Sequence, residues 1–138
     1  AKGVKPSEIK KYTNLIDIIP TAASLANINY TNYTLGNNAL DIDQKNNHAF
    51  LYQKINGEPA ITLLKDSLQY TKTISNSYSQ LYNMNNKEKW VDIKKSHPLL
   101  NKKMDSLVSS IYHSTKYLYY NNKKKINEIF FVLKQYII

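Results

Sequence analysis

Side chains that could hold a metal ion or exchange protons are widely separated in this chain. The three histidines, His48, His97 and His113, have no partner at the spacing of an HxxxH or HExxH motif. The closest acidic pair is Asp41 and Asp43, whose asparagine-rich surroundings lack the glycine and the glutamate of a calcium-binding loop. We therefore expect structural or solvent-exposed roles for these residues.

The usual sequence motifs of nucleophilic catalysis are absent from the chain as well. The chain has no cysteine, no GxSxG sequence and only three glycines, so a glycine loop that cradles phosphate is not recognisable. One group of tyrosines could stack on sugars or bases, although we favour packing against a sheet: Tyr112, Tyr117, Tyr119 and Tyr120. The sequence therefore predicts no catalytic, cofactor-binding or metal-binding residue in this chain.

The excess of basic residues raises the question of a polyanionic partner. Lysine supplies all 19 basic residues against 10 acidic ones, which gives a net charge of +9. Arginine, the side chain best suited to bidentate contacts with phosphates and base edges, is absent. Asparagine, lysine, isoleucine and tyrosine are all abundant, as in A+T-rich genomes, so codon bias explains part of the lysine excess. We expect a solvated lysine surface and no nucleic-acid partner.

Length and composition are those of a folded domain. The chain has 138 residues, of which 42% are hydrophobic and 21% charged, values within the globular range. The most apolar run, Ile126 to Ile138, is too short for a membrane span and is interrupted by Glu128 and Lys134. No signal-peptide pattern is present, and the basic opening resembles a surface segment. We expect a soluble piece of a longer protein.

The elements that would position these side chains follow from periodicity and turn residues. Near the N-terminus, apolar spacing and Pro20 predict a short helix from about Pro20 to Ala26, followed by an asparagine-rich loop. Residues 47–84 then show short β-type segments with turn residues between them. The four predicted strands, joined as an antiparallel meander, are His48–Lys54, Ala60–Leu64, Leu68–Ile74 and Tyr78–Met84.

A long amphipathic helix is predicted after the strands, from about Pro98 to Tyr120, with Ser96 as its N-cap. Asn121, Asn122 and the following lysines are expected to end it, and the tail at residues 126–138 could be a helix or a strand. Its apolar stripe should lie on one face of the sheet: Leu100, Met104, Leu107, Val108, Ile111, Thr115 and Leu118. The fold class is thus α+β, with parts at 1–46, 47–125 and 126–138.

The segment with the most specific pattern lies near the N-terminus. Asp17 stands between apolar pairs and is followed by Pro20 and Thr21, then by a short apolar helix, by Gly36 and by an apolar pair at Ala39–Leu40. In this order the residues resemble the sulfatase family of the alkaline phosphatase superfamily. In that family the segment follows the last catalytic residues and belongs to the edge of the large α/β domain, which is the assignment the resemblance implies for residues 1–46.

The later part of the chain is similar to the same family. Residues 80–90 (QLYNMNNKEKW) resemble its late strand, with Asn83 where aspartate is usual and without the Asp-Pro that follows. Residues 109–124 resemble the tail of the lipoteichoic acid synthase-like branch, where Tyr117-Leu118-Tyr119 fits well. The resemblance covers about residues 8 to 125. A small four-stranded antiparallel sheet packed by a C-terminal helix, here residues 47–125, is how such enzymes end.

The resemblance implies a membrane-anchored parent enzyme, with its catalytic domain on the extracytoplasmic face of a bacterial cell membrane. That domain would hold a divalent metal, manganese or calcium, and its nucleophile, a threonine or a formylglycine, would lie upstream of Ala1. This chain would then be a structural C-terminal subdomain, with the upstream catalytic domain as its partner and no cofactor of its own.

A lysine-rich module that binds anionic cell-wall polymer or lipid headgroups is the alternative. It would gather its lysines on one face: Lys2, Lys5, Lys10, Lys11 and Lys123 to Lys125. Scattered lysines would favour the structural subdomain instead.

Overall fold

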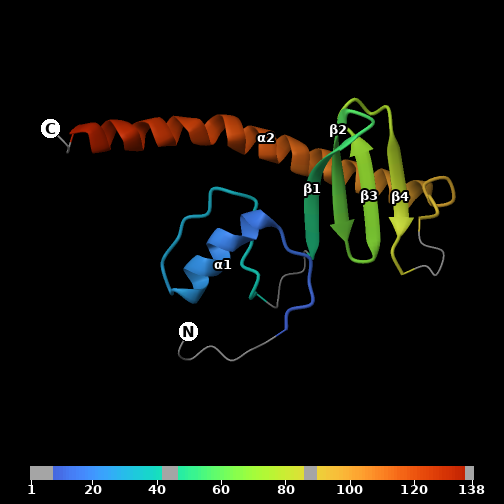
Figure 1. Ribbon diagram of the computed structural model, residues 1–138, viewed down its shortest axis with the longest axis horizontal. Helices are drawn as coiled ribbons and strands as arrows, with labels where there is room; N and C mark the ends of the chain where they lie inside the picture. Colours follow the sequence, from blue (N-terminus) through green and yellow to red (C-terminus); the bar gives the residue numbers. More distant parts are fainter. Residues whose placement is uncertain (1–7, 42–46, 86–89, 136–138) are drawn as a thin grey trace.

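The computed structural model describes residues 8–41, 47–85 and 90–135 of the chain, with side chains as far as Asn121. Its fold is α+β, as expected: one four-stranded antiparallel sheet, a long C-terminal helix and a short N-terminal helix (Figure 1).

The sheet is a simple meander whose strands pair in sequence order. The strands are β1 (His48–Ile55), β2 (Glu58–Lys65), β3 (Leu68–Thr73) and β4 (Ser79–Asn83), and every neighbouring pair is antiparallel. Positive φ angles occur in all three connections, at Asn56, Asp66 and Asn76 (50°, 54° and 61°), where asparagine and aspartate tolerate the left-handed region. All four predicted strands are confirmed, with small shifts at their ends.

The core lies between one face of this sheet and the first half of α2 (Pro98–Gln135). Met104 and Val108 of the helix are buried against Leu63, Tyr70 and Leu81 of the sheet. Partly buried residues of the predicted stripe extend the contact along the helix: Leu100, Leu107 and Ile111. The prediction that α2 packs its apolar stripe on one face of the sheet is confirmed from Leu100 to Ile111, whereas Thr115 of the predicted stripe is exposed.

The predicted start of α2 at Pro98 is confirmed, whereas its predicted N-cap and its predicted end need correction. Its first helical residue is Pro98, but the side chain of Ser96 donates to the carbonyl of Ile93 and does not cap the helix. The helix does not end at Tyr120 and continues to Gln135. Asn121 remains inside it, where its side-chain amide donates to the carbonyl of Tyr117 at 2.8 Å.

The continuation of α2 has a simple physical reason. Between residues 121 and 135 the sequence contains no glycine or proline, and lysine is a good helix former, so nothing interrupts the ladder of main-chain hydrogen bonds. The expected boundary at 125/126 therefore falls within the helix. Figure 1 shows α2 projecting well beyond the sheet. Residues 136–138 of the predicted tail lie outside the described part of the chain.

The N-terminal segment forms a short helical unit beside the β1 edge of the sheet (Figure 1). A 3-10 turn, η1 (Leu15–Asp17), leads directly into α1 (Ile18–Leu25), so helical structure begins earlier than predicted. Pro20 sits in the first turn of α1, where its missing amide proton removes no hydrogen bond. Among the described residues, no helix has both the length and the apolar character needed to cross a membrane.

Candidate functional site

The histidines that the sequence singled out lie on different elements. His48 begins β1, His97 precedes α2, and His113 lies on the exposed surface of α2. Asp41 lies in the asparagine-rich loop, whereas Asp43 lies outside the described residues. Within the part of the chain that the structure describes, His, Cys, Asp and Glu side chains form no group of three that could hold a metal ion.

Asp17 is the most constrained polar side chain of the N-terminal unit. It is buried, and each of its two carboxylate oxygens accepts a main-chain N–H at 2.7 Å: Oδ2 from Asn14 and Oδ1 from Asn37. One bond closes the start of η1, and the other holds the loop that follows α1. Hydrogen bonds to an ionised carboxylate are stronger than those between neutral groups. Asp17 thus joins two segments that are twenty residues apart.

Asp17 was expected to be a structural residue that caps the start of α1, and its partners differ from that expectation. Its side chain accepts no hydrogen bond from a main-chain amide of α1. The reason is η1: at Asp17 the chain is already helical (φ −80°, ψ −12°), so the side chain turns away from the helix end and toward the loop.

Two further contacts fasten the same loop. The Thr21 hydroxyl donates to the carbonyl of Asp17 at 2.6 Å and accepts the N–H of Ala39 at 2.8 Å. Gly36 lies so close to η1 that an added Cβ would stand 2.1 Å from the carbonyl oxygen of Ile16. Residues of the N-terminal sequence pattern are therefore joined through close contacts, in a unit that we call the Asp17 junction: Asp17, Thr21, Gly36, Asn37 and Ala39.

Large apolar side chains beside this junction are open to solvent. Leu15 is 85% exposed, and Ile18 and Ile19 on α1 are 59% and 60% exposed. A groove of about 580 Å³ lies between Leu15 and Ile18 on one side and Phe50 and Leu51 of β1 on the other. We call Leu15, Ile18, Ile19 and Leu25 the N-terminal apolar surface, and no described segment of the chain covers it.

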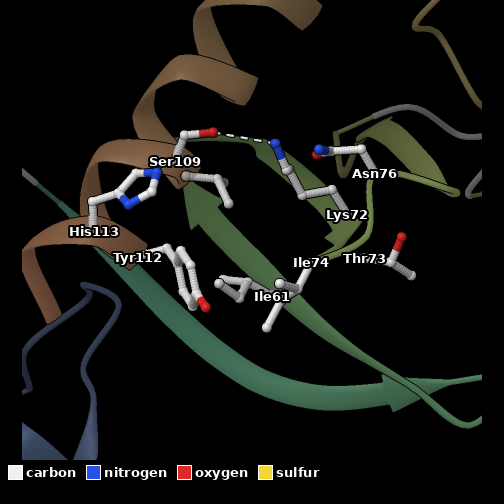
Figure 2. Close-up of a pocket in the computed structure, with 9 residues that line it drawn as sticks. Ile61, Lys72, Thr73, Ile74, Asn76, Ser109, Tyr112 and His113 are labelled. Atoms are coloured by element: carbon white, nitrogen blue, oxygen red, sulfur yellow. Dashed lines mark hydrogen bonds between the residues drawn. The ribbon is translucent and has the colours of Figure 1, made fainter. Parts of the chain in front are cut away.

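A second candidate site lies between the β3–β4 connection and α2, and Figure 2 shows its lining. Lys72 of β3 enters it from the sheet, with Nζ donating to Asp105 Oδ1 at 2.8 Å and to Ser109 Oγ at 3.1 Å. The hydroxyl of Tyr70 donates to the same carboxylate oxygen at 2.8 Å. The pocket has a volume of about 230 Å³.

These contacts shift two pKa values in opposite directions. Burial raises the pKa of Tyr70 well above its ordinary value, and the bond to Asp105 acts in the same direction. Burial acts to raise the pKa of Asp105 too, but the hydrogen bonds from Lys72 and Tyr70 and the charge of Lys72 outweigh it, so that pKa is lowered. The carboxylate of Asp105 is thereby kept ionised between its two donors.

Ser109 and Lys72 are at the distance of a serine nucleophile and a lysine base, but their surroundings oppose that chemistry. Nζ of Lys72 is held by the carboxylate of Asp105 at 2.8 Å and donates to Ser109 Oγ, so it is not placed to accept the Ser109 proton. We therefore assign Lys72 and Asp105 a structural ion pair. Sequence spacing gave no signal for this site, because the two residues are 33 positions apart on a strand and a helix.

The tyrosines on α2 divide into two groups. Tyr112 packs against the core, as predicted. Packing was predicted for the other three as well and is wrong for them, because the helix has left the sheet at that point: Tyr117, Tyr119 and Tyr120 are 66%, 58% and 61% exposed.

The lysines that would mark a binding module can be followed only in part. Lys11 donates to the carbonyls of Asn38 and Asp41, and Lys10 lies 4.0 Å from Glu8. The remaining lysines of that set belong to residues 1–7 and to side chains after Asn121, outside the described part.

In comparisons with known proteins, the chain matches no protein-family model and no curated protein.

Proposed function

We propose that this chain is the structural C-terminal subdomain of a sulfatase-like enzyme of the lipoteichoic acid synthase-like branch. Its role is to support the edge of the upstream catalytic domain and to shape one side of its cleft. The N-terminal apolar surface is the observation that carries the proposal, because large apolar side chains gathered on one surface mark an interaction site.

The energetics favour a covering partner for that surface. Burying one leucine or isoleucine side chain fully is worth about 1.5–3 kcal/mol. Leu15, Ile18, Ile19 and Leu25 are all more than half exposed, so a partner that covered them would gain several kcal/mol before its ordering costs. The Asp17 junction holds their backbone in place, which reduces the entropy lost on docking.

The occupant that we propose is the catalytic domain ahead of Ala1 in the same polypeptide. The residues that resemble the sulfatase family, among them Asp17, Thr21 and Gly36, form the junction directly under the apolar surface. In the parent enzyme the nucleophile and a divalent metal, manganese or calcium, belong to that upstream domain, on the extracytoplasmic face of the membrane. This chain supplies neither of them.

A module that binds anionic polymer or lipid headgroups is the second candidate, and one observation favours it. Tyr117 and Tyr120 are exposed on the projecting part of α2, with exposed Lys116 beside them. Aromatic faces stack on sugar rings and a lysine attracts phosphate, so this part of the helix offers both kinds of contact.

The proposal is tested by charging the apolar surface in the full-length parent protein. Leu15→Lys should lower the melting temperature of the parent, because it places a charge in the proposed interface. Leu99→Lys is the matched control, because Leu99 is 84% exposed and Leu15 is 85% exposed. Leu99 lies at the start of α2, outside the N-terminal apolar surface. Equal melting temperatures for the two variants, or a gene that encodes no domain ahead of Ala1, would contradict the proposal.

Activity measurements provide an independent check. We expect the full-length protein to cleave or transfer a phosphate or sulfate ester in a metal-dependent reaction, and the 138-residue chain alone to show none. Metal-dependent turnover by the isolated chain, lost when one of its own residues is replaced, would show that this division of roles is wrong.

A further inference from the structure

The pocket between the β3–β4 connection and α2 contains more hydrogen-bonding capacity than the fold uses. Lys72 has three N–H donors, of which Asp105 and Ser109 take two. Among the described residues, the carboxamide of Asn76 and the imidazole of His113 have no hydrogen-bond partner, and both line the pocket. Figure 2 shows the amine of Lys72 between the Ser109 hydroxyl and the Asn76 carboxamide. Free donors therefore converge at one end of the pocket.

The opposite wall of the pocket is apolar. Ile61, Ile74 and the ring of Tyr112 form it, while His113 lies at the α2 side. A volume of about 230 Å³ equals that of roughly eight water molecules in the liquid. The space thus suits a small molecule with one polar end and a short apolar body, which is the composition typical of ligand pockets.

The charge at the polar end selects the ligand class. The side chain of Lys72 is only 14% exposed, so its attraction for an anion is less screened than at an open surface. Asp105 lies 2.8 Å from this amine and offsets its unit charge, so a ligand would meet the third N–H of Lys72 with a carboxylate beside it. A dianion such as a phosphate monoester would leave excess negative charge beside Asp105, whereas a singly charged carboxylate adds less.

We propose that this pocket binds a small organic acid with a single carboxylate. The carboxylate accepts the third N–H of Lys72 and an N–H of the Asn76 carboxamide, and the apolar body packs on Ile61, Ile74 and Tyr112. The inference is independent of the proposed parent enzyme, because it depends only on residues of β2, β3, the β3–β4 connection and α2.

Titrations of the 138-residue chain with three probes test the ligand class: benzoate, benzamide and phenyl phosphate. The readout is the set of amide chemical shifts in NMR spectra. Benzoate should shift the amide signals of Asn76 and His113, and benzamide, which lacks the charge, should bind at least about tenfold more weakly, as expected when a hydrogen-bonded charge is lost. Benzamide binding as tight as benzoate, tighter binding of phenyl phosphate, or no saturable shift with benzoate would each overturn the proposal.

Two matched variants locate the site. Asn76→Gly removes the carboxamide without straining the turn, because glycine adopts the positive φ of this position (61°) readily. Asn56→Gly makes the same change in the β1–β2 turn (φ 50°), and Asn56 does not line the pocket. We expect Asn76→Gly to weaken benzoate binding at least about tenfold, the loss of one hydrogen bond to a charged group, and Asn56→Gly to leave it unchanged. Equal affinities in both variants would place benzoate elsewhere.

Lys72→Met provides the stronger test of the charge. Methionine keeps the length of the side chain but has no donor, so benzoate binding should be lost. Amide shifts in the rest of the sheet report whether the Lys72→Met variant keeps its fold. If that variant is not folded, the benzoate affinity of Asn76→Gly decides whether benzoate binds in this pocket. Undiminished benzoate binding by a folded Lys72→Met chain would overturn the proposal.

Discussion

Single carboxylates connect segments that lie far apart in the sequence of this protein. Asp17 ties η1 to the loop after α1, and Asp105 ties α2 to β3 through Lys72 and Tyr70. Each carboxylate accepts at least two hydrogen bonds, which compensates for its removal from water. Local spacing in the sequence identified Asp17 as structural, but the contact with Asn37 depends on the tertiary fold.

Replacing Asp17 measures the strength of the Asp17 junction. Asp17→Ala removes the carboxylate that accepts two main-chain N–H groups, so both hydrogen bonds are lost. We therefore expect a loss of about 2–4 kcal/mol in the stability of this unit. Hydrogen exchange at the amides of Asn14 and Asn37 reports it directly, and both should exchange much faster. Slow exchange at Asn37 in the variant would show that the junction is held by other contacts.

In the full-length parent, the same replacement should lower the melting temperature before it lowers specific activity. An unchanged melting temperature with abolished turnover would mean that Asp17 works in the active site. That result would contradict the assignment of this chain to a supporting role.

Asp105 gives the protein a predictable dependence of stability on pH. Its pKa is lower in the folded state, so the ionised carboxylate stabilises the fold above the ordinary pKa of aspartate, about 4. This contribution is lost as the pH falls through the lowered pKa of the folded state. The free energy of unfolding of Asp105→Asn should therefore lie below that of the unchanged chain near neutral pH, and the gap should narrow in acid. Denaturant melts from about pH 7 down to about pH 3 test this, and a gap that stays constant would contradict it.

At the scale of elements, turn residues and periodicity were sufficient for the sheet. Asn56-Gly57 and Asp66 stand where the backbone must take positive φ, so the strand ends and the antiparallel order followed from local chemistry. The apolar stripe likewise predicted which side of α2 meets the sheet. The end of α2 was missed, because asparagine and lysine discourage a helix only weakly and no glycine or proline stops it.

The pocket between the β3–β4 connection and α2 could not have been predicted from the sequence. Lys72 stands in a strand of alternating pattern, where a lysine normally indicates the solvent face. Asp105 and Ser109 are four residues apart on α2 and so share a face, but nothing in their spacing shows that this face meets Lys72. The site arises when β3 and α2 pack together.

The contact of α2 with the sheet should carry much of the stability of this part of the fold. Met104 is only 3% exposed against β2, β3 and β4, so Met104→Ala should lower the free energy of unfolding by about 2–5 kcal/mol. Lys103→Ala, at the preceding exposed position, is the control and should cost less than about 0.5 kcal/mol. Urea unfolding of both variants measures the difference, and similar losses would contradict the packing of α2 on the sheet.

At the scale of the whole molecule, two surfaces extend beyond the compact sheet and helix unit. The N-terminal apolar surface lies beside β1, and the second half of α2 projects past the sheet (Figure 1). The tyrosines on this part of α2 are exposed because no sheet lies against the helix there to bury them. An amphipathic pattern predicts which side of a helix is buried, but it does not tell how far along the helix its partner extends.

The projecting part of α2 should contribute little to the stability of the sheet. The last described helix side chains packed on the core are Ile111 and Tyr112. A chain shortened to end at Asn121 should therefore unfold with a free energy within about 1 kcal/mol of the unchanged chain. Shortening to end at Leu107 removes Val108 and Ile111 and should abolish cooperative unfolding. Thermal melts at several protein concentrations measure the stability of both variants. If the variant that ends at Asn121 loses much stability and the loss grows with concentration, the projecting helices pair between two copies of the chain. A large loss of stability that does not depend on concentration would mean that residues 122–138 fold back onto the unit that the sheet and α2 form.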